Sequence, residues 1–175
     1  MAVAVAVAFV LLGAPASAAD LRPWAGAAPS SFTLPQFGAP QSEPVALASQ
    51  SGDTILVHFF ASWCEPCRDE LPALQRLAGR GAPSLKVLAV AVADNDAPLR
   101  RLIDATGVTF PVLMDRDRAV ARAWSITTLP STVILDSRHI ARLIAESDVA
   151  WDSITPTQLH APHTQVTQGG QPHAR

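Results

Sequence analysis

The sequence predicts one α/β domain, a sandwich in which helices flank a central mixed sheet. Short apolar, β-rich runs alternate with segments of helical periodicity, and the last two runs are joined by a polar turn. Alternation of strands and helices favours parallel pairing, and the closing hairpin adds an antiparallel pair. Of the 175 residues, 49% are hydrophobic, which supports a packed core.

The predicted elements follow one another in a regular order. Residues 55–60 form an apolar run typical of a buried strand, and residues 65–77 carry leucines on one helical face. The same criteria predict strands at 32–34, 45–48, 85–92 and 110–114, helices at 97–106 and 119–124, a hairpin of 131–135 with 140–145, and a short helix within 147–155.

Both cysteines of the chain lie in one Cys-x-x-Cys unit, Cys64 to Cys67, where the predicted strand meets the helix. Residues three positions apart in a helical turn have Cα atoms about 5–6 Å apart, which is within the range that a disulfide needs. The pair can therefore open and close with little backbone movement, as a redox catalyst requires. With no other cysteine, the unit cannot belong to a four-thiolate zinc site.

The two thiols occupy different positions in the first turn. Cys64 lies near the free amide groups at the helix N-terminus, where the helix dipole stabilises a thiolate and makes it nucleophilic. Cys67 lies one turn further in, more buried, and is placed to attack a mixed disulfide. Pro66 suits the first turn because its missing N–H costs nothing there. Pro72 falls inside the helix and is expected to kink it.

Four segments share their residue pattern with one known family. Together they resemble the thioredoxin superfamily, specifically its TlpA/ResA-like extracytoplasmic thiol-disulfide oxidoreductases, over about residues 30–152. The resemblance implies a thioredoxin-like sandwich in which residues 32–34 and 45–48 are an N-terminal strand addition. The segments are Ser31-Phe32-Thr33-Leu34-Pro35, Ile55 to Ala61, Trp63-Cys64-Glu65-Pro66-Cys67-Arg68-Asp69-Glu70-Leu71-Pro72 and Leu129-Pro130-Ser131-Thr132-Val133-Ile134-Leu135-Asp136.

The resemblance implies further site residues around the cysteines. Leu129–Pro130 would be a cis peptide bond beside the disulfide, with backbone groups that align a substrate chain. Trp63, Glu65, Pro66 and Leu129 are the expected substrate contacts. The alternatives are a proline at the start of a strand for Pro130 and plain core packing for Trp63.

Two ionisable side chains are candidates for proton transfer. Glu70 matches an acidic residue that ResA-like proteins place near the thiols, and it shares a helix face with Cys67. We expect Glu70 to handle the proton of Cys67, with His58 as a secondary participant. His58 stands where cytosolic thioredoxins have Asp and this branch commonly has Asn. The alternatives are a solvated helix charge for Glu70 and a satisfied core histidine for His58.

The implied activity is thiol-disulfide exchange through a Cys64–Cys67 dithiol/disulfide cycle, which needs no dissociable cofactor. Glu65 places negative charge beside Cys64, which opposes thiolate formation and favours a reducing couple. We therefore expect a protein-disulfide reductase. Relatives with this motif commonly keep the cysteines of apocytochrome c or of copper sites reduced, and they receive electrons from a membrane thiol-transfer protein.

Two other functions are alternatives. Peroxiredoxins have a Thr or Ser three residues before the peroxidatic cysteine and a Pro four residues earlier, where this chain has Ala61 and Val57. A thiol peroxidase is thus disfavoured. A copper chaperone, or another thioredoxin-like binding module, would use both cysteines and a histidine. Copper-carrying relatives usually space their cysteines by three residues, and neither His58 nor His139 matches their distant histidine ligand.

The ends of the chain differ in composition from the predicted domain at 32–155. Residues 1–19 are typical of a signal peptide, although no Lys or Arg precedes Arg22, so an uncleaved membrane tether or an upstream start is an alternative. We expect a bacterial periplasmic or other extracytoplasmic location. Residues 20–31 are predicted as an extended lead-in, and residues 156–175 as a disordered polar tail. The net charge of −2 argues against nucleic-acid binding.

Overall fold

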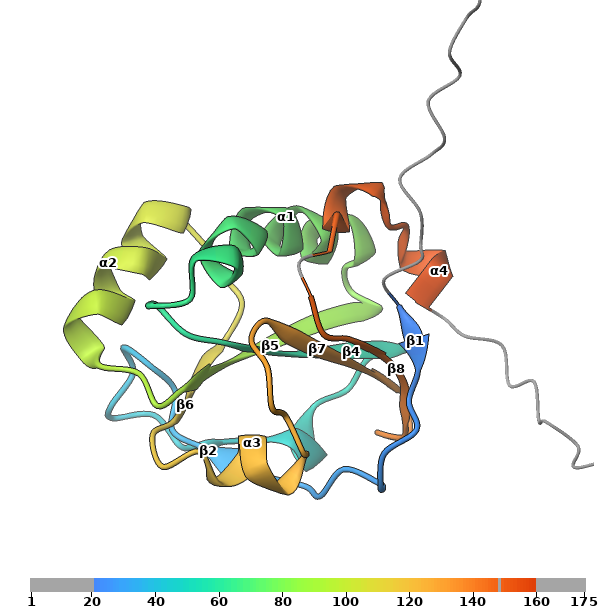
Figure 1. The fold of residues 1–175 in the computed structure, drawn as a ribbon, viewed down its shortest axis with the longest axis horizontal. Coiled ribbons are helices and arrows are strands. Elements are labelled where there is room, and N and C mark those ends of the chain that lie inside the picture. Colours follow the sequence, from blue (N-terminus) through green and yellow to red (C-terminus); the bar gives the residue numbers. More distant parts are fainter. Residues whose placement is uncertain (1–20, 148, 160–175) are drawn as a thin grey trace, which may run out of the picture.

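The computed structural model describes residues 21–147 and 149–159. A six-stranded sheet forms its centre, with the strand order β1-β8-β7-β4-β5-β6 (Figure 1). A two-stranded antiparallel pair, β2 with β3, lies apart from it. The strands are β1 (Arg22–Pro23), β2 (Thr33–Leu34), β3 (Val45–Ala46), β4 (Thr54–Phe60), β5 (Leu85–Val92), β6 (Val112–Asp115), β7 (Ser131–Asp136) and β8 (Ala141–Ala145).

The sheet is mixed, as the sequence predicts. Its central strand β4 pairs in parallel with β5 and antiparallel with β7, and all seven of its residues are buried. A strand buried on both faces reads as a continuous apolar run, which explains the composition of residues 55–60. Because β4 and β5 are parallel, their carboxyl ends meet at one edge of the sheet. The Cys-x-x-Cys segment follows β4 at that edge.

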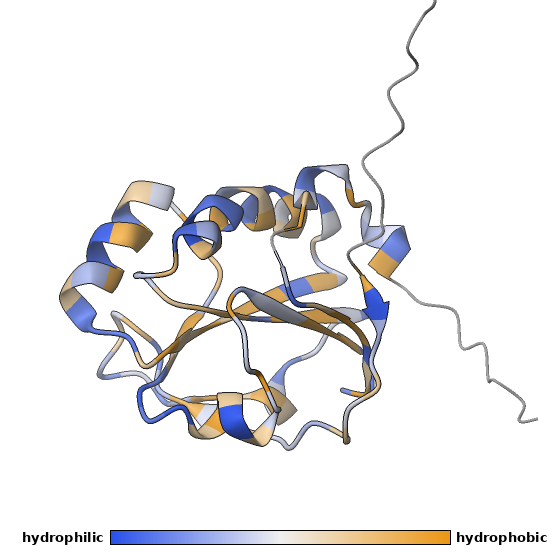
Figure 2. Ribbon diagram, viewed as in Figure 1, coloured by the Kyte–Doolittle hydropathy of each residue, from blue (hydrophilic) through white to orange (hydrophobic). Residues whose placement is uncertain are grey.

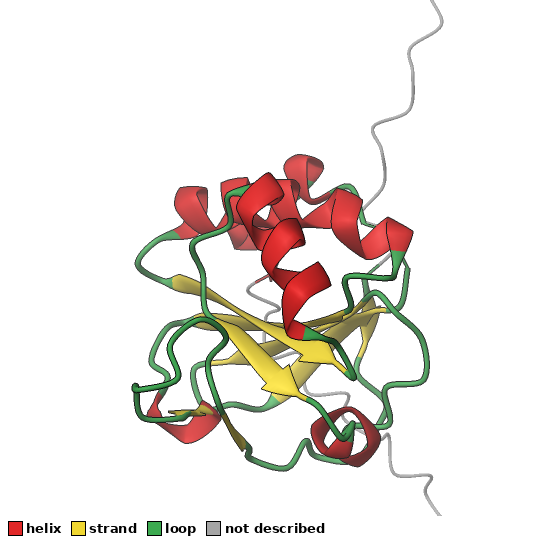
Figure 3. Ribbon diagram, turned by 90° about the vertical axis from the view of Figure 1, so that its left-hand side faces the viewer, coloured by secondary structure: helices red, strands yellow, loops and turns green. Residues whose placement is uncertain are grey.

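Helices cover both faces of the sheet (Figures 1 and 3). The helix α1 (Glu65–Gly81) and the helix α2 (Asp96–Thr106) lie on one face, while α3 (Ala119–Ala123) and the β2–β3 pair lie on the other. Hydrophobic residues concentrate on the strands between these layers (Figure 2). Alternate residues of β4 serve the two sides: Leu56 packs with the α1 leucines, whereas Phe59 packs against Trp124 after α3.

The helix α1 carries the site and is held firmly against the sheet. Leu71, Leu74 and Leu77 are fully buried on one face, as the periodicity predicts. The helix continues through Pro72 to Gly81, four residues beyond its predicted end. At Gly81 a Cβ atom would lie 2.5 Å from the Leu85 Cβ, so the absence of a side chain allows the helix to end close against β5.

Two of the predicted boundaries need correction. The lead-in at 20–31 contains β1, which pairs antiparallel with β8 and so belongs to the sheet. The predicted disordered tail begins too early, because residues 156–159 form the helix α4 (Pro156–Leu159). In this helix Leu159 is 2% exposed and packs with the apolar cluster under α1. The predicted signal peptide at 1–19 and the tail from 160 lie outside the described residues. Within the described residues, no helix has the length and apolar character to cross a membrane.

Candidate active site

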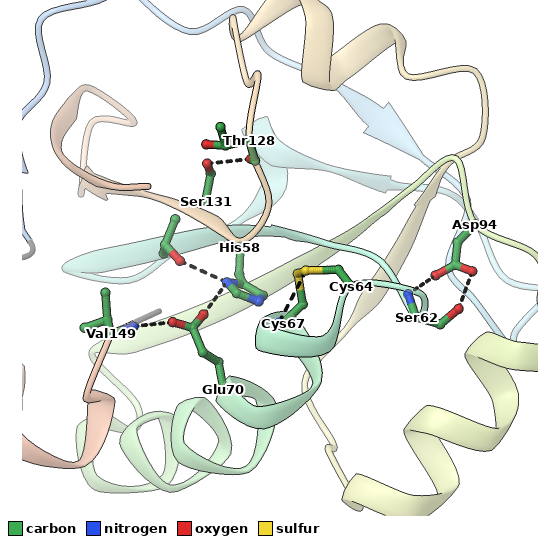
Figure 4. Close-up of a disulfide and its surroundings, with 10 residues drawn as sticks. His58, Ser62, Cys64, Cys67, Glu70, Asp94, Thr128, Ser131 and Val149 are labelled. Carbon is green, nitrogen blue, oxygen red and sulfur yellow. Dashed lines mark hydrogen bonds and ion pairs between the residues drawn. A yellow bond between two sulfur atoms is a disulfide. The ribbon is translucent and has the colours of Figure 1, made fainter. Parts of the chain in front are cut away.

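The two cysteines form a disulfide at the N-terminus of α1 (Figure 4). Their Cα atoms are 5.3 Å apart, within the range predicted from the spacing. Cys64 is the N-cap residue, and its Sγ accepts a hydrogen bond from the Cys67 backbone N–H at 3.4 Å. Cys64 is 7% exposed, while Cys67 is fully buried. An attacking thiol can therefore reach only the outer sulfur of the pair.

Glu70 and His58 meet beneath the disulfide, on the side of the sheet that α1 covers. Glu70 is 4% exposed, so it is not a solvated helix charge. Its Oε1 accepts a hydrogen bond from the Val149 backbone N–H, and its Oε2 lies 3.9 Å from Nδ1 of His58. The same Nδ1 lies 2.9 Å from the Thr132 hydroxyl. The helix α1, the strands β4 and β7 and the segment after β8 thus converge on one buried polar cluster.

His58 is an uncharged buried base rather than a fully satisfied core histidine. Burial lowers the pKa of His58 from 6.5 to about 3, so the imidazole is neutral at physiological pH. Its Nε2 is buried and has no hydrogen-bond partner among the described residues. In Figure 4 this nitrogen points toward the disulfide, while Nδ1 points toward Thr132 and Glu70.

The proline loop lies over the same site. The Leu129–Pro130 peptide bond is cis, as the resemblance implies. The Ser131 hydroxyl donates a hydrogen bond to the Thr128 carbonyl at 2.8 Å, which closes this loop on itself. Leu129 is half-buried and packs against the apolar cluster that contains both cysteines. Leu129, one of the residues expected to contact substrate, thus adjoins the disulfide.

Three other predicted contact residues face the solvent. Trp63 is 61% exposed, the most exposed large hydrophobic side chain among the described residues, so it does not pack in the core. Glu65 and Pro66 are also exposed. A cleft of about 580 Å³ begins at these two residues and continues along α1 to the segment 149–152. Asp152 in this cleft pairs with Arg76 at 2.6 Å, and this hydrogen bond lowers the pKa of Asp152.

Sequence reasoning missed a second anchor of the site, Asp94. This buried residue follows β5, next to Ala93, whose φ is +49°. Its carboxylate accepts hydrogen bonds from the backbone N–H and the hydroxyl of Ser62, and also from the Asn95 N–H. Figure 4 shows Asp94 and Ser62 on the far side of the disulfide from Glu70. The available signal was an acidic residue two positions after the end of a predicted buried strand.

The described residues contain no group of three or more His, Cys, Asp or Glu side chains arranged to hold a metal ion. The two histidines considered for copper are both engaged elsewhere. Nδ1 of His58 contacts Thr132, and Nε2 of His139 lies 2.9 Å from the Gln50 carbonyl oxygen. Two sulfurs, a neutral imidazole and a buried carboxylate are residue types suited to thiol and proton chemistry.

Known proteins are similar to this chain in sequence. The chain is 32% identical over 101 residues to the thioredoxin-like protein YneN of Bacillus subtilis, covering 56% of this chain and 59% of the relative. It is 28% identical over 93 residues to the thiol-disulfide oxidoreductase ResA of the same organism, covering 53% and 52%. The chain thus spans between half and three-fifths of the length of these curated relatives.

Solved structures show the same architecture. The crystal structure of StoA from Bacillus subtilis matches with a TM-score of 0.60 at 24% identity, over 77% of this chain and 97% of that one. A secreted disulfide oxidoreductase from Mycobacterium tuberculosis matches with a TM-score of 0.61 at 18% identity, over 69% and 89%. The thioredoxin-like fold and the ResA-like resemblance are therefore confirmed. A family model described as AhpC/TSA matches residues 25–144, and the chain belongs to the AhpC/TSA family.

Proposed function

We propose that this protein is a thiol-disulfide oxidoreductase that reduces disulfides in other proteins. The observation that carries the proposal is the Cys64–Cys67 disulfide itself, which caps α1 beside cis-Pro130 with one sulfur reachable and one enclosed. A disulfide that served stability would more often close a long loop, because its stabilisation grows with loop length. Here the loop spans three positions.

The cycle requires only the two thiols of the chain and two electrons. In the reduced protein, the Cys64 thiolate attacks a substrate disulfide, forms a mixed disulfide and releases the first substrate thiolate. Cys67 then loses its proton and attacks the Cys64 sulfur. This step releases the second substrate thiolate and restores the Cys64–Cys67 disulfide. Two electrons have passed to the substrate, and a thiol donor must return them.

We assign the proton of Cys67 to the buried pair of His58 and Glu70. A neutral imidazole whose Nε2 faces the disulfide can accept this proton transiently, and the Glu70 carboxylate 3.9 Å from Nδ1 stabilises the short-lived positive charge. The Thr132 hydroxyl holds the ring in this orientation. Glu70 thus acts through His58. The sequence predicts the reverse, with Glu70 as the main proton acceptor and His58 as a secondary participant.

The setting of the reaction is proposed from the family. The secreted disulfide oxidoreductase of Mycobacterium tuberculosis, which has the same fold, and the resemblance to the extracytoplasmic branch support an extracytoplasmic location for this chain. Its substrates would be protein disulfides, such as those formed at cytochrome c haem sites or copper sites, and its electron donor a membrane thiol-transfer protein. The cycle uses no dissociable cofactor.

The activity is tested by insulin reduction with dithiothreitol as the electron source. We expect turnover that is abolished by Cys64→Ser. Cys67→Ser should instead accumulate a mixed disulfide with the substrate, because the attack succeeds and the resolving step is missing. Equal activity of Cys64→Ser and the native protein would contradict the proposal.

The proton assignment is tested separately by titrating the thiols of the reduced protein. Replacement Glu70→Gln should lower the pH at which the buried thiol ionises, because a negative charge that opposes the thiolate is gone. His58→Asn should also shift this pH, because the side chain between the carboxylate and the disulfide is replaced. Asp69→Asn is the matched control, because Asp69 is exposed on the same helix. An unchanged titration in His58→Asn and Glu70→Gln would remove both residues from the mechanism.

A further inference from the structure

A second cleft borders the proline loop on the side away from α1. Its volume is about 300 Å³, and Val92 at the end of β5 forms part of its wall. Leu129 connects this cleft to the active site, because it lines the cleft and also packs with the cluster that contains both cysteines. Its other main lining residues are Arg118, Arg122, Ile126, Thr127 and Thr128.

The cleft carries positive charge that the described residues leave uncompensated. Arg118 and Arg122 are both exposed and line the cleft, and no acidic side chain lines it. Arg122 donates a hydrogen bond only to the Asp117 backbone carbonyl, at 2.7 Å. Neither arginine forms an ion pair with a described residue, in contrast to Arg116, which pairs with Asp96 at 2.6 Å.

The cleft along α1, on the other side of the cysteines, has the opposite charge. Glu65 and Asp69 line it, and neither has an ion-pair partner among the described residues. A carboxylate on a bound chain would be repelled there and attracted to the arginines. The hydroxyls of Thr127 and Thr128 add hydrogen-bond donors that suit a carboxylate.

We propose that the Arg118–Arg122 cleft binds a carboxylate side chain of the substrate polypeptide, within a few residues of the cysteine that reacts with Cys64. The inference rests on the proposed oxidoreductase function and specifies its substrates. These are protein segments with Asp or Glu on one side of the reactive cysteine. An extended segment advances about 3.3 Å per residue, so a chain that crosses the proline loop reaches the cleft within a short distance.

The size and salt dependence of the effect follow from the exposure of the arginines. Two exposed ion pairs correspond to about a three- to tenfold difference in rate. The difference should decrease as salt is raised, because the screening length falls from about 8 Å at 0.15 M to about 3 Å at 1 M. A preference due to apolar contacts would persist at high salt.

The experiment uses peptides with one cysteine held as a mixed disulfide with a chromogenic thiol, flanked by Asp, Asn or Lys. The second-order rate of the reduced full chain is measured with each peptide. We expect the Asp peptide to react about three- to tenfold faster than the Asn peptide at low salt, and the Lys peptide to react slowest. If no peptide reacts, the proposed function itself fails. If all three react equally, the function stands and the carboxylate site is overturned.

Variants locate the site. The ratio of the Asp to the Asn rate should fall to about one in Arg118→Ala/Arg122→Ala, and should persist in the charge-conserving Arg118→Lys/Arg122→Lys. A ratio does not depend on the fraction of folded protein. Arg138→Ala is the matched control, because Arg138 is exposed in the turn at the opposite end of β7 from Pro130. A preference that survives Arg118→Ala/Arg122→Ala would overturn the assignment.

Discussion

Asp94 fixes the position of Ser62, two residues before Cys64. The Asp94 Oδ2 accepts the Ser62 backbone N–H at 2.6 Å, and its Oδ1 accepts the Ser62 hydroxyl at 2.7 Å. The two residues follow neighbouring parallel strands, so the carboxylate joins the loop after β5 to the loop that presents Cys64. The N-terminus of α1 is thereby held from both sides, by Asp94 and by Glu70.

Replacement Asp94→Asn should weaken this anchor. Both carboxylate oxygens of Asp94 accept a hydrogen bond from Ser62, but the amide of Asn has only one oxygen. Its NH₂ group would face a donor of Ser62, and the unsatisfied buried donor costs about 1–3 kcal/mol. We expect a loss of that size in the free energy of unfolding and a slower reaction of Cys64 with a small alkylating reagent. Asp104→Asn, on the exposed face of α2, is the control. Native stability and native thiol reactivity in Asp94→Asn would contradict this role.

The buried His58 should make the protein less stable in mild acid. The unfolded chain binds a proton on His58 below about pH 6.5, whereas the folded protein does not until about pH 3. Between these values the unfolded state binds more protons, so stability falls as the pH is lowered, by up to about 1.4 kcal/mol per pH unit.

Urea unfolding of the native protein and His58→Asn between pH 4 and 7.5 measures this effect. The difference in unfolding free energy between the two should shrink toward low pH and stay constant above about pH 7. His58→Gln, which also cannot titrate, should behave like His58→Asn. A difference that is independent of pH would show that His58 titrates alike in the folded and unfolded chains.

Glu65 should make the disulfide couple more reducing. We expect a potential below about −230 mV, toward the value of thioredoxin. Because Glu65 is exposed beside Cys64, its charge disfavours the thiolate by a modest amount. Glu65→Gln should raise the potential by about 5–20 mV.

Redox-buffer titration followed by tryptophan fluorescence measures the potential. Trp63 adjoins the disulfide and is exposed, so it should report the redox state, and Trp63→Phe should remove the signal. Asp69→Asn controls for a general loss of negative charge on the same helix. A potential near about −120 mV would make the protein an oxidant instead.

Leu159 should contribute to the stability of the whole domain. It is nearly fully buried with Trp151 and the leucines of α1, so Leu159→Ala should cost about 2–5 kcal/mol. Thr157→Ala, exposed two residues earlier, should change stability by less than about 0.5 kcal/mol. The free energy of unfolding of both variants is measured by chemical denaturation. If Leu159→Ala is as stable as Thr157→Ala, α4 does not unfold together with the rest of the domain.

Much of the fold could be predicted because its signals are local. The strand β4 is an unbroken apolar run, and the leucines of α1 recur at helical spacing, so both elements are evident without knowledge of their neighbours. The strand β1 and the helix α4 could not be predicted in this way. They have two and four residues, which is too short for a periodic pattern of apolar residues. They form because β8 offers an unpaired edge and because the cluster under α1 accommodates Leu159.

The candidate site was predictable only in part for a similar reason. Cys64, Cys67 and Pro130 belong to motifs with fixed spacing, and Glu70 is related to Cys67 by one helical turn. Asp94 lies 32 positions from Ser62 in the sequence, and only the parallel pairing of β4 with β5 brings them together. The direction in which the His58 ring nitrogens point likewise depends on Thr132 from another strand.

Both lateral edges of the sheet are protected from pairing with foreign chains. On one side, β1 is only two residues long and contains Pro23, which has no N–H to offer. On the other, the segment 35–37 covers β6 through hydrogen bonds to Val112 and Met114. Exposed strand edges are the usual starting points of aggregation. If the proposed exchange of disulfides with other proteins takes place at the carboxyl ends of β4 and β5, a bound chain meets the sheet at the ends of its strands and not along an edge that could extend it.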